Sequence, residues 1–516
     1  MKYRNPLLPG FYPDPSVCRV GEDYYLVNSS FEFFPGVPLW HSRDLVNWEQ
    51  LGHVLDRRSQ VELEGSRVSG GIFAPTIRYH QGKYYMITTN VTHGGNFVVC
   101  TEDPKGPWSD PVWIDQGGID PSLFWDEDGK VYMQRTHTDE NGEQCIGQFQ
   151  VDLETGKALS EVRPIWYGTG GKCPEGPHIY KIRGKYYLMI AEGGTEYGHM
   201  ETIARSDSIW GPFESCPHNP ILTHRNINPR SGEFQALGHA DLVEDGKGNW
   251  WLVFHGIRPS QFMLHHMGRE TMLAPVTWDE NGWPVVGEGK PILAEMEGPG
   301  EPEETLPDGF ARQNLFSQDE DFTQEQELPL VWAYLRNPHE ENYKLEQGLT
   351  LTAGEDGLES LGSPSFVGRR QQHFDVAVET VLDFAPQSEK AEAGLTVFHT
   401  KDHHYDLVIT QRNGQRAAFL RRRCADMLVE SQPVVLPEEG KLTLTIQARQ
   451  LGFEFFVQAG DGHPQSLGTA STQLISTECM ICTFTGCFFG LYCQGEKGAQ
   501  ARFETFRYQP VTTETK

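Results

Sequence analysis

Three carboxylic acids occupy similar positions in separate parts of the sequence: Asp14, Asp120 and Glu175. Each lies about ten to twelve residues before an aromatic residue that recurs along the chain, and two further segments carry Ala74 and His239 at the same place. A single acid there would ordinarily be a turn cap. Three acids brought together repel one another and shift each other's pKa values, which a purely structural role does not explain. We therefore predict that they meet in a catalytic site.

The set matches the needs of glycosidic bond cleavage. One protonated acid must lie beside the leaving oxygen and one carboxylate near the anomeric carbon. A third carboxylate can keep the acid protonated by repulsion. The sequence contains no GxSxG, HExxH or P-loop motif and no GxGxxG that opens a helix. Glycoside hydrolysis is therefore favoured, and this chemistry requires no cofactor.

Five repeated units must position these acids. Each contains a turn with glycine followed by a strand in which aromatic residues precede aliphatic ones, and another short apolar strand precedes the turn. Units of about 50 residues with several strands are typical of propeller blades, whose innermost strands converge on one axis. We predict an all-β chain with a five-bladed β-propeller over residues 1–297, and a large irregular sandwich is the alternative. The recurring strands are DYYLV (23–27), KYYMI (83–87), KVYMQ (130–134), KYYLM (185–189) and NWWLV (249–253).

A second domain follows an acidic stretch rich in proline and glycine. We predict a linker over residues 298–309, because this stretch has no periodic pattern. Beyond it, segments such as 374–384 and 441–449 alternate apolar and polar residues, as in an antiparallel sheet with one buried face. We predict a C-terminal β-sandwich over residues 310–516.

The composition excludes several classes of partner. The net charge of −28 disfavours binding to nucleic acids or to anionic membranes. No apolar run approaches about 18 residues, and the N-terminus lacks the features of a signal peptide, so we predict a cytoplasmic protein. The ten cysteines form neither a dense disulfide framework nor a zinc set, and we predict that they are buried free thiols.

Long ordered motifs make the whole chain resemble glycoside hydrolase family 43, in particular its two-domain β-xylosidases and α-L-arabinofuranosidases. This resemblance implies a five-bladed propeller followed by a β-sandwich, which agrees with the repeat count. The motifs are NPLLPGFYPDPSVCRVGEDYYLVNSSFEFFPGVPLWHSRDLVNW (5–48), SGGIFAPTIRYH (69–80), GGIDPSLFWDEDGKVYM (117–133), PEGPHIYK (174–181), GHADLVED (238–245) and MGRETMLAPVTW (267–278).

The resemblance also implies roles for the acids. Asp14 corresponds to a general base that activates water, and Glu175 to the general acid. Asp120 corresponds to a residue that modulates the pKa of the acid and orients it. The family inverts the anomeric configuration, which requires room for a water molecule between base and acid.

Further residues correspond to binding positions of the family. Phe31 and Phe73 resemble apolar walls of the sugar subsite, although some relatives carry tryptophan in place of Phe73. Arg269 resembles an arginine that binds the terminal sugar and offsets the negative charge of the acids. His239 resembles a central histidine that in some members contacts a divalent cation such as calcium, although a channel histidine without metal fits the sequence equally well. Phe484, in a loop of the second domain, corresponds to a residue at the rim of the pocket.

The substrate that the resemblance implies is a small oligosaccharide. We expect the removal of terminal pentoses from xylo-oligosaccharides, with β-1,4-xylosidase favoured. An α-L-arabinofuranosidase would use the same residues and differ only in pocket shape. A non-catalytic glycan-binding propeller is the remote alternative, and it is disfavoured because all three acids are present. The sequence leaves open whether the chain forms homo-oligomers.

Overall fold

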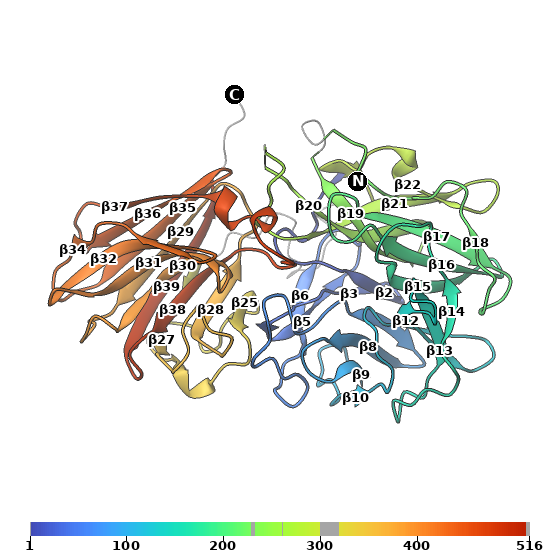
Figure 1. The fold of residues 1–516 in the computed structure, drawn as a ribbon, viewed down its shortest axis with the longest axis horizontal. Coiled ribbons are helices and arrows are strands. Elements are labelled where there is room, and N and C mark those ends of the chain that lie inside the picture. Colours follow the sequence, from blue (N-terminus) through green and yellow to red (C-terminus); the bar gives the residue numbers. More distant parts are fainter. Residues whose placement is uncertain (1, 229–232, 261, 300–318, 512–516) are drawn as a thin grey trace.

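The computed structural model describes residues 2–228, 233–260, 262–299 and 319–511, and their regular secondary structure is almost entirely β-strand (Figure 1). Five antiparallel sheets of four strands form a five-bladed β-propeller. In chain order the blades comprise β2 (Ser16–Val20), β3 (Asp23–Val27), β5 (Gly36–Ser42) and β6 (Glu49–Leu55); β7 (Thr76–His80), β8 (Lys83–Asn90), β9 (Gly95–Thr101) and β10 (Val112–Trp113); β11 (Ser122–Trp125), β12 (Val131–Thr138), β13 (Gln144–Gln150) and β14 (Arg163–Trp166); β15 (Glu175–Ile182), β16 (Lys185–Glu192), β17 (Met200–Ser206) and β18 (Glu214–Ser215); and β19 (Gln235–Glu244), β20 (Trp250–Ile257), β21 (Glu270–Trp278) and β22 (Pro284–Val286).

The first strand of each blade lies on the inside of the propeller. The five first strands, β2, β7, β11, β15 and β19, each contact the next one round the ring, and β19 contacts β2. The ring is closed by the ends of the domain, since β1 (Lys2–Arg4) pairs with β23 (Glu295–Glu297). Each predicted repeat therefore corresponds to one blade.

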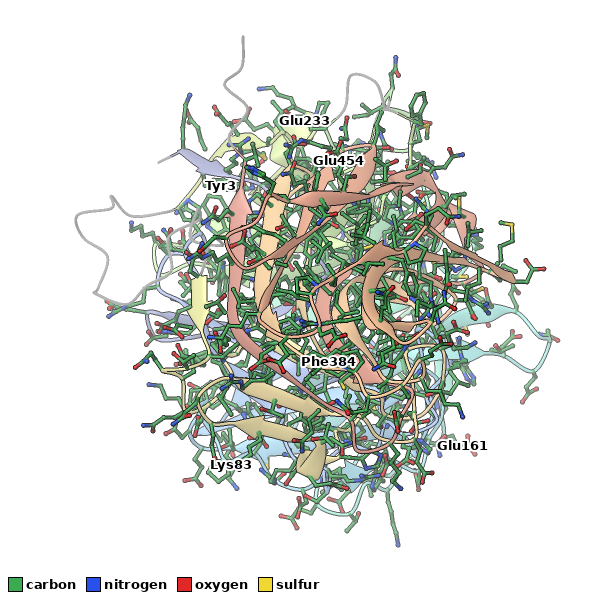
Figure 2. The ribbon with its side chains drawn as sticks, turned by 90° about the vertical axis from the view of Figure 1, so that its left-hand side faces the viewer. Tyr3, Lys83, Glu161, Glu233, Phe384 and Glu454 are labelled. Carbon is green, nitrogen blue, oxygen red and sulfur yellow. The ribbon has the colours of Figure 1, made fainter. Side chains whose placement is uncertain are left out.

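The second domain is a β-sandwich of two antiparallel sheets around one apolar core, and Figure 2 shows it in front of the propeller, with Phe384 and Glu454 labelled. Strands such as β29 and β35 alternate buried and half-buried residues, as their sequence predicts. One sheet contains β26 (Tyr343–Leu345), β27 (Leu349–Thr352), β39 (Gln500–Pro510), β29 (Val376–Asp383), β35 (Leu442–Arg449), β36 (Gly452–Ala459) and β37 (Gln465–Ser471), with β24 (Asp319–Asp321) paired to β39. The other contains β33 (Met427–Glu430), β32 (Gln415–Cys424), β31 (His403–Arg412), β30 (Glu392–Thr400), β38 (Phe488–Gln494), β28 (Ser365–Arg370), β25 (Trp332–Leu335) and β4 (Phe33–Phe34), with β34 (Val434–Val435) paired to β32. Short 3-10 turns are η1 (Gly287–Gly289), η3 (Glu340–Asn342), η4 (Thr472–Ile475) and η5 (Thr477–Cys479).

The two domains share a sheet and a core. Strand β4, which comes from the first blade, pairs with β25 and so becomes the edge strand of a sandwich sheet. Phe33 of β4 stacks on Phe488 of β38 with ring centroids 4.1 Å apart, inside a buried aromatic cluster drawn from both domains. Arg336 of the sandwich is buried and donates two hydrogen bonds to the carbonyl oxygen of Ser66 in the propeller. The sandwich is therefore fixed against the propeller by strand pairing and shared burial.

Most of the predicted linker (298–309) lies outside the described residues. All ten cysteines are free thiols, but Cys479 and Cys482 are exposed. Five of the others are buried, and Cys100, Cys173 and Cys424 are half-buried. The prediction of buried thiols is wrong for Cys479 and Cys482, because they lie at the end of η5 and in the loop that follows it rather than in a strand. Within the part of the chain that the structure describes, no helix is long and apolar enough to cross a membrane.

Candidate active site

The inner strands place residues of unusual backbone geometry at the site. Asp14, Asp120 and His239 have φ values of 52°, 54° and 52°, in the left-handed region that non-glycine residues rarely adopt. In the fourth blade Gly176 takes this conformation, at 56°, and the pairing of β15 with β16 is interrupted directly after Glu175. Our alignment of Glu175 with the other two acids is therefore wrong by one residue, because sequence spacing does not reveal a β-bulge.

A cavity of about 90 Å³ lies where the inner strands meet. All three acids line it, and so do the other residues that the sequence suggested for substrate binding. The lining residues are Asp14, Phe31, Phe73, Ala74, Ile119, Asp120, Glu175, Thr195, His239, Arg269 and Phe484. All five blades and the sandwich therefore contribute side chains to one small space.

Asp14 is buried among groups that stabilise its negative charge. Its Oδ1 accepts a hydrogen bond of 2.5 Å from Nη1 of Arg269, and its Oδ2 accepts one of 2.5 Å from the hydroxyl of Ser29. Nδ1 of His255 lies 3.1 Å from Oδ1. Burial pushes the pKa of Asp14 upward, but Arg269, His239 and His255 together hold it well below its usual range. Asp14 is therefore ionised at neutral pH.

Glu175 has the opposite environment. Burial raises its pKa well above the usual range, and the negative charges of Asp120 and Asp14 raise it further. Its Oε1 is buried and has no hydrogen-bond partner among the described residues. Asp120 accepts a hydrogen bond of 3.3 Å from the backbone N–H of Gly176, the residue after Glu175, and burial raises the pKa of Asp120 to about 6. Glu175 therefore keeps its proton to a higher pH than an ordinary glutamate, and the neighbouring carboxyl group of Asp120 contributes to this.

Aromatic rings form the wall of the cavity on the side of the sandwich. The ring of Phe31 lies 5.2 Å from that of Phe73 and 6.0 Å from that of Phe484. Phe484 lies in the loop before β38, and its backbone N–H donates to Oγ of Ser69, 2.9 Å away. Nη2 of Arg269 in turn donates to the carbonyl oxygen of Phe484, 3.4 Å away. The sandwich therefore contacts the arginine that binds Asp14.

His239, which the family resemblance links to a divalent cation, belongs to a stack of histidine rings. It stacks on His255, which stacks on His199, with centroid separations of 5.7 and 5.1 Å. Calcium takes about six to eight oxygen ligands. No group of three His, Cys, Asp or Glu side chains in the described part of the chain could hold a metal ion. These donors do not fit a protein-held calcium ion, and the cation remains a prediction.

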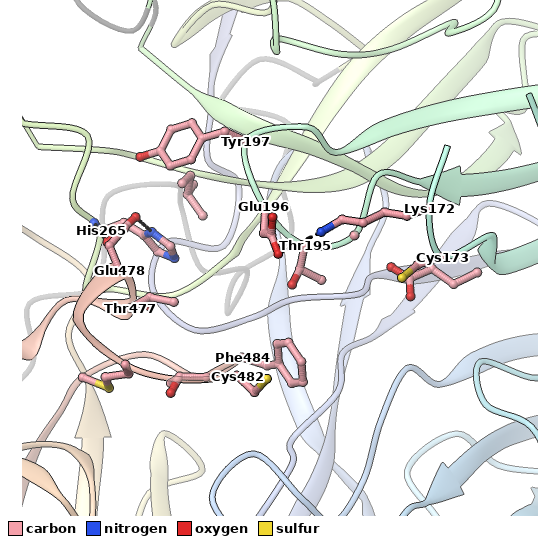
Figure 3. Close-up of a pocket in the computed structure, with 15 residues that line it drawn as sticks. Lys172, Cys173, Thr195, Glu196, Tyr197, His265, Thr477, Glu478, Cys482 and Phe484 are labelled. Carbon is pink, nitrogen blue, oxygen red and sulfur yellow. Dashed lines mark hydrogen bonds and ion pairs between the residues drawn. The ribbon is translucent and has the colours of Figure 1, made fainter. Parts of the chain in front are cut away.

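Two larger cavities adjoin the small one, and Glu175 lines all three. One, of about 420 Å³, lies between the propeller and the sandwich (Figure 3). Lys172 and Tyr197 line it from the propeller, and Glu478 and Phe484 line it from the sandwich. The other, of about 490 Å³, lies beside the third blade. A bound molecule that extends out of the small cavity past Glu175 therefore has room in either of the two larger cavities.

The sequence did not single out three residues that hold the site together: Ser29, Ser69 and His255. Ser29 and His255 bind Asp14, and Ser69 holds the loop that carries Phe484. Ser29 follows β3, and His255 is a polar residue in the otherwise apolar β20, so each lies at or near the end of the second strand of its blade. A polar residue at that position is the sequence signal that could have identified Ser29 and His255.

Comparisons with known proteins agree with this arrangement. Residues 3–284 match the model of glycosyl hydrolases family 43, and residues 319–509 match the beta xylosidase C-terminal concanavalin A-like domain. A non-reducing end alpha-L-arabinofuranosidase of Bacteroides ovatus is 43% identical over 98% of this chain and 94% of its own length. A xylosidase/arabinosidase of Butyrivibrio fibrisolvens is 42% identical over 79% of this chain and 80% of its own. The crystal structure of a xylan beta-1,4-xylosidase from Bacillus halodurans superposes with a TM-score of 0.91 at 34% identity, over 98% of this chain and all of the other.

Proposed function

This chain belongs to family 43 of the glycosyl hydrolases, and from that premise we propose that it releases single terminal pentoses from xylo-oligosaccharides, with β-1,4-xylosidase as the main activity. The proposal rests on the observation that two carboxyl groups in one cavity have opposite environments. Asp14 is held ionised by Arg269 and Ser29, whereas Glu175 is buried without a partner for Oε1. Hydrolysis of a glycoside needs one carboxyl group in each state.

Asp14 acts as the general base in this proposal. Its Oδ1 and Oδ2 accept hydrogen bonds from Arg269 and Ser29, and its backbone N–H donates to Nδ1 of His255, so the carboxylate is fixed in place. The carboxylate accepts a proton from a water molecule as the water oxygen attacks the anomeric carbon. Arg269 offsets the negative charge of the carboxyl groups and lies within reach of a sugar in the cavity.

Glu175 acts as the general acid and donates its proton to the glycosidic oxygen as the bond to the anomeric carbon breaks. Asp120 keeps Glu175 protonated and, through its bond to the N–H of Gly176, fixes the backbone beside it. In a single displacement the configuration at the anomeric carbon inverts. Proton NMR taken early in xylobiose hydrolysis should therefore show α-xylose before mutarotation, and β-xylose as the first product would contradict the single displacement.

Terminal cleavage follows from the size and closure of the cavity. The cavity of about 90 Å³, walled by Phe31, Phe73 and Phe484, is too small for a sugar chain that passes through it. The leaving group extends past Glu175 into the larger cavities. Xylopyranose has no exocyclic hydroxymethyl group, which suits the close aromatic walls.

A second candidate is α-L-arabinofuranosidase, because the Bacteroides ovatus relative at 43% identity carries that name. The test is to measure kcat/KM on 4-nitrophenyl β-D-xylopyranoside and on 4-nitrophenyl α-L-arabinofuranoside under the same conditions. The main proposal expects the higher value on the xyloside, together with release of xylose from xylobiose. A higher value on the arabinofuranoside, without xylobiose hydrolysis, would reverse the order of the two candidates.

We also propose that the protein works in the reducing environment of the cytoplasm, without nucleic acid or membrane partners. Ten free thiols and a net charge of −28 support this setting. Fractionation of the native cells with an antibody to the chain should recover it with cytoplasmic markers. Recovery in the medium or the periplasm would contradict the proposal.

A further inference from the structure

The cavity beside the third blade contains a cationic side chain that the proposed reaction does not use. The cavity has a volume of about 490 Å³ and opens next to Glu175. Arg135 of β12 lines it and is 6% exposed. Glu175 is the one carboxyl group among the described residues that line it, and burial and the nearby acids raise its pKa. An anion in this cavity would therefore meet the guanidinium of Arg135, and the one carboxyl group beside it keeps its proton to a higher pH than usual.

The guanidinium of Arg135 is only partly satisfied by the protein. Its Nη1 donates to the carbonyl oxygen of Thr136 at 2.7 Å and lies 3.3 Å from Nδ1 of His137. Its Nε is buried and has no partner, and neither Nε nor Nη2 forms a hydrogen bond among the described residues. No carboxylate in that part of the chain forms an ion pair with Arg135. Because Nε is buried, Nη2 is the nitrogen through which Arg135 can bind a carboxylate in the cavity.

The surroundings hold this side chain in place. A Cβ on Gly118, whose φ is 91°, would lie 3.0 Å from Nη1 and 2.7 Å from Cδ of Arg135, so the side chain packs directly on the backbone there. The loop of Gly118 is tied to β12 by a bond of 2.8 Å from the N–H of Ile119 to Oγ1 of Thr136. Leaving a buried guanidinium unpaired costs stability, because arginine stays charged. A ligand that supplies the missing carboxylate explains why the position is occupied by arginine.

We propose that this cavity binds a carboxylate on the leaving-group part of the substrate, namely a uronic acid branch on the sugar next to the terminal pentose. The inference rests on the proposed function, because Glu175 must lie at the bond between the terminal sugar and the branched one. Arg135 binds the carboxylate through Nη2. Thr136, Thr138 and Gln144 line the same cavity and offer polar groups to the hydroxyls of the branch. The enzyme is thereby selective for acidic xylo-oligosaccharides.

The test uses two xylotrioses that differ by one group. One carries a glucuronosyl branch on the xylose next to the non-reducing end, and the other carries the glucosyl branch made by reducing that carboxyl group. Arg135→Gln should lower kcat/KM on the uronosyl substrate by about tenfold to a hundredfold, the usual effect of losing hydrogen bonds to a charged group. Its kcat/KM on the glucosyl substrate and on plain xylotriose should stay within about threefold of the wild type. Arg135→Lys should recover part of the loss.

Two controls separate the outcomes. Lys172→Gln removes a cation that lines only the cavity facing the sandwich, and it should leave the ratio of uronosyl to glucosyl hydrolysis unchanged. Equal losses on all substrates in Arg135→Gln, or a ratio that changes with Lys172 and not with Arg135, would overturn the inference. Hydrolysis of plain xylotriose by the wild type reports the proposed function separately. If that hydrolysis fails, calorimetric binding of the uronosyl compound to wild type and Arg135→Gln decides the inference, and equal affinities would reject it.

Discussion

Asp14 and Glu175 line the same cavity at the start of the inner strands of two blades and are both buried, but the groups that surround each carboxyl group differ. Asp14 has an arginine, a hydroxyl and two histidines around its oxygens, whereas Glu175 has an unpaired oxygen and two other carboxyl groups nearby. Burial acts on both in the same direction, so the neighbours decide the protonation state. The comparison shows that the surroundings of a carboxyl group, and not its residue type, determine whether it serves as the base or as the acid.

Removing Asp14 should have the largest effect, because the reaction then has no base on any substrate. Asp14→Ala should lower kcat by about a thousandfold to ten-thousandfold, on good and poor leaving groups alike. Steady-state kinetics on xylobiose and on the nitrophenyl xyloside measure this loss. Asp14→Asn is the matched variant that keeps the side-chain size. Thermal unfolding of both variants tests whether the buried Arg269 destabilises the fold once its carboxylate partner is removed. A loss confined to poor leaving groups would assign Asp14 the role of the acid.

The wall supplied by the sandwich should contribute less than either carboxyl group. Phe484→Ala opens the cavity to water and removes an aromatic contact with the sugar, so kcat/KM should fall by about 1–3 kcal/mol in barrier terms. Phe488→Leu is the control, since Phe488 is fully buried in the core between the domains. It should lower the melting temperature and leave kcat/KM within about twofold. Unchanged kinetics in Phe484→Ala would reduce the sandwich to a structural role.

The smallest expected change is the effect of Asp120 on the pKa of Glu175, which the pH dependence of activity reports. Its negative charge raises the pKa of Glu175, so Asp120→Asn should lower that pKa. Glu175 must be protonated to act, and activity is lost as the pH rises through its pKa. The alkaline limb of kcat/KM against pH, measured on xylobiose, should therefore move down by about one unit. An alkaline limb that stays in place would count against this role of Asp120.

The repeats predicted the blades, because each strand and turn follows local rules of hydrophobic alternation and glycine geometry. They did not predict the bulge that shifts Glu175, since one extra residue in a strand leaves no mark on the spacing of aromatic residues. Strand β4 was also missed. It has two residues, and its partner β25 is about 300 residues away in the sequence, so no periodic pattern indicates it.

Phe484 could be placed only through the family resemblance. Nothing in the sequence around it indicates that a loop of the second domain reaches the propeller, because the contact depends on how the two domains are fixed by β4 and the shared aromatic cluster. Arg135 was missed for a different reason. A single arginine in a strand is ordinarily a surface residue, and only the structure shows that it is buried without an anionic partner.

The central claim is that Glu175 delivers a proton while Asp14 accepts one, and the leaving-group dependence of Glu175→Ala tests it most directly. The measurement compares kcat/KM on xylobiose, whose leaving group needs protonation, with kcat/KM on 2,4-dinitrophenyl β-xyloside, whose leaving group needs little. Glu175→Ala should lose about a hundredfold to ten-thousandfold on xylobiose and less than about tenfold on the dinitrophenyl substrate. Equal losses on the two substrates would contradict the assignment of Glu175 as the acid.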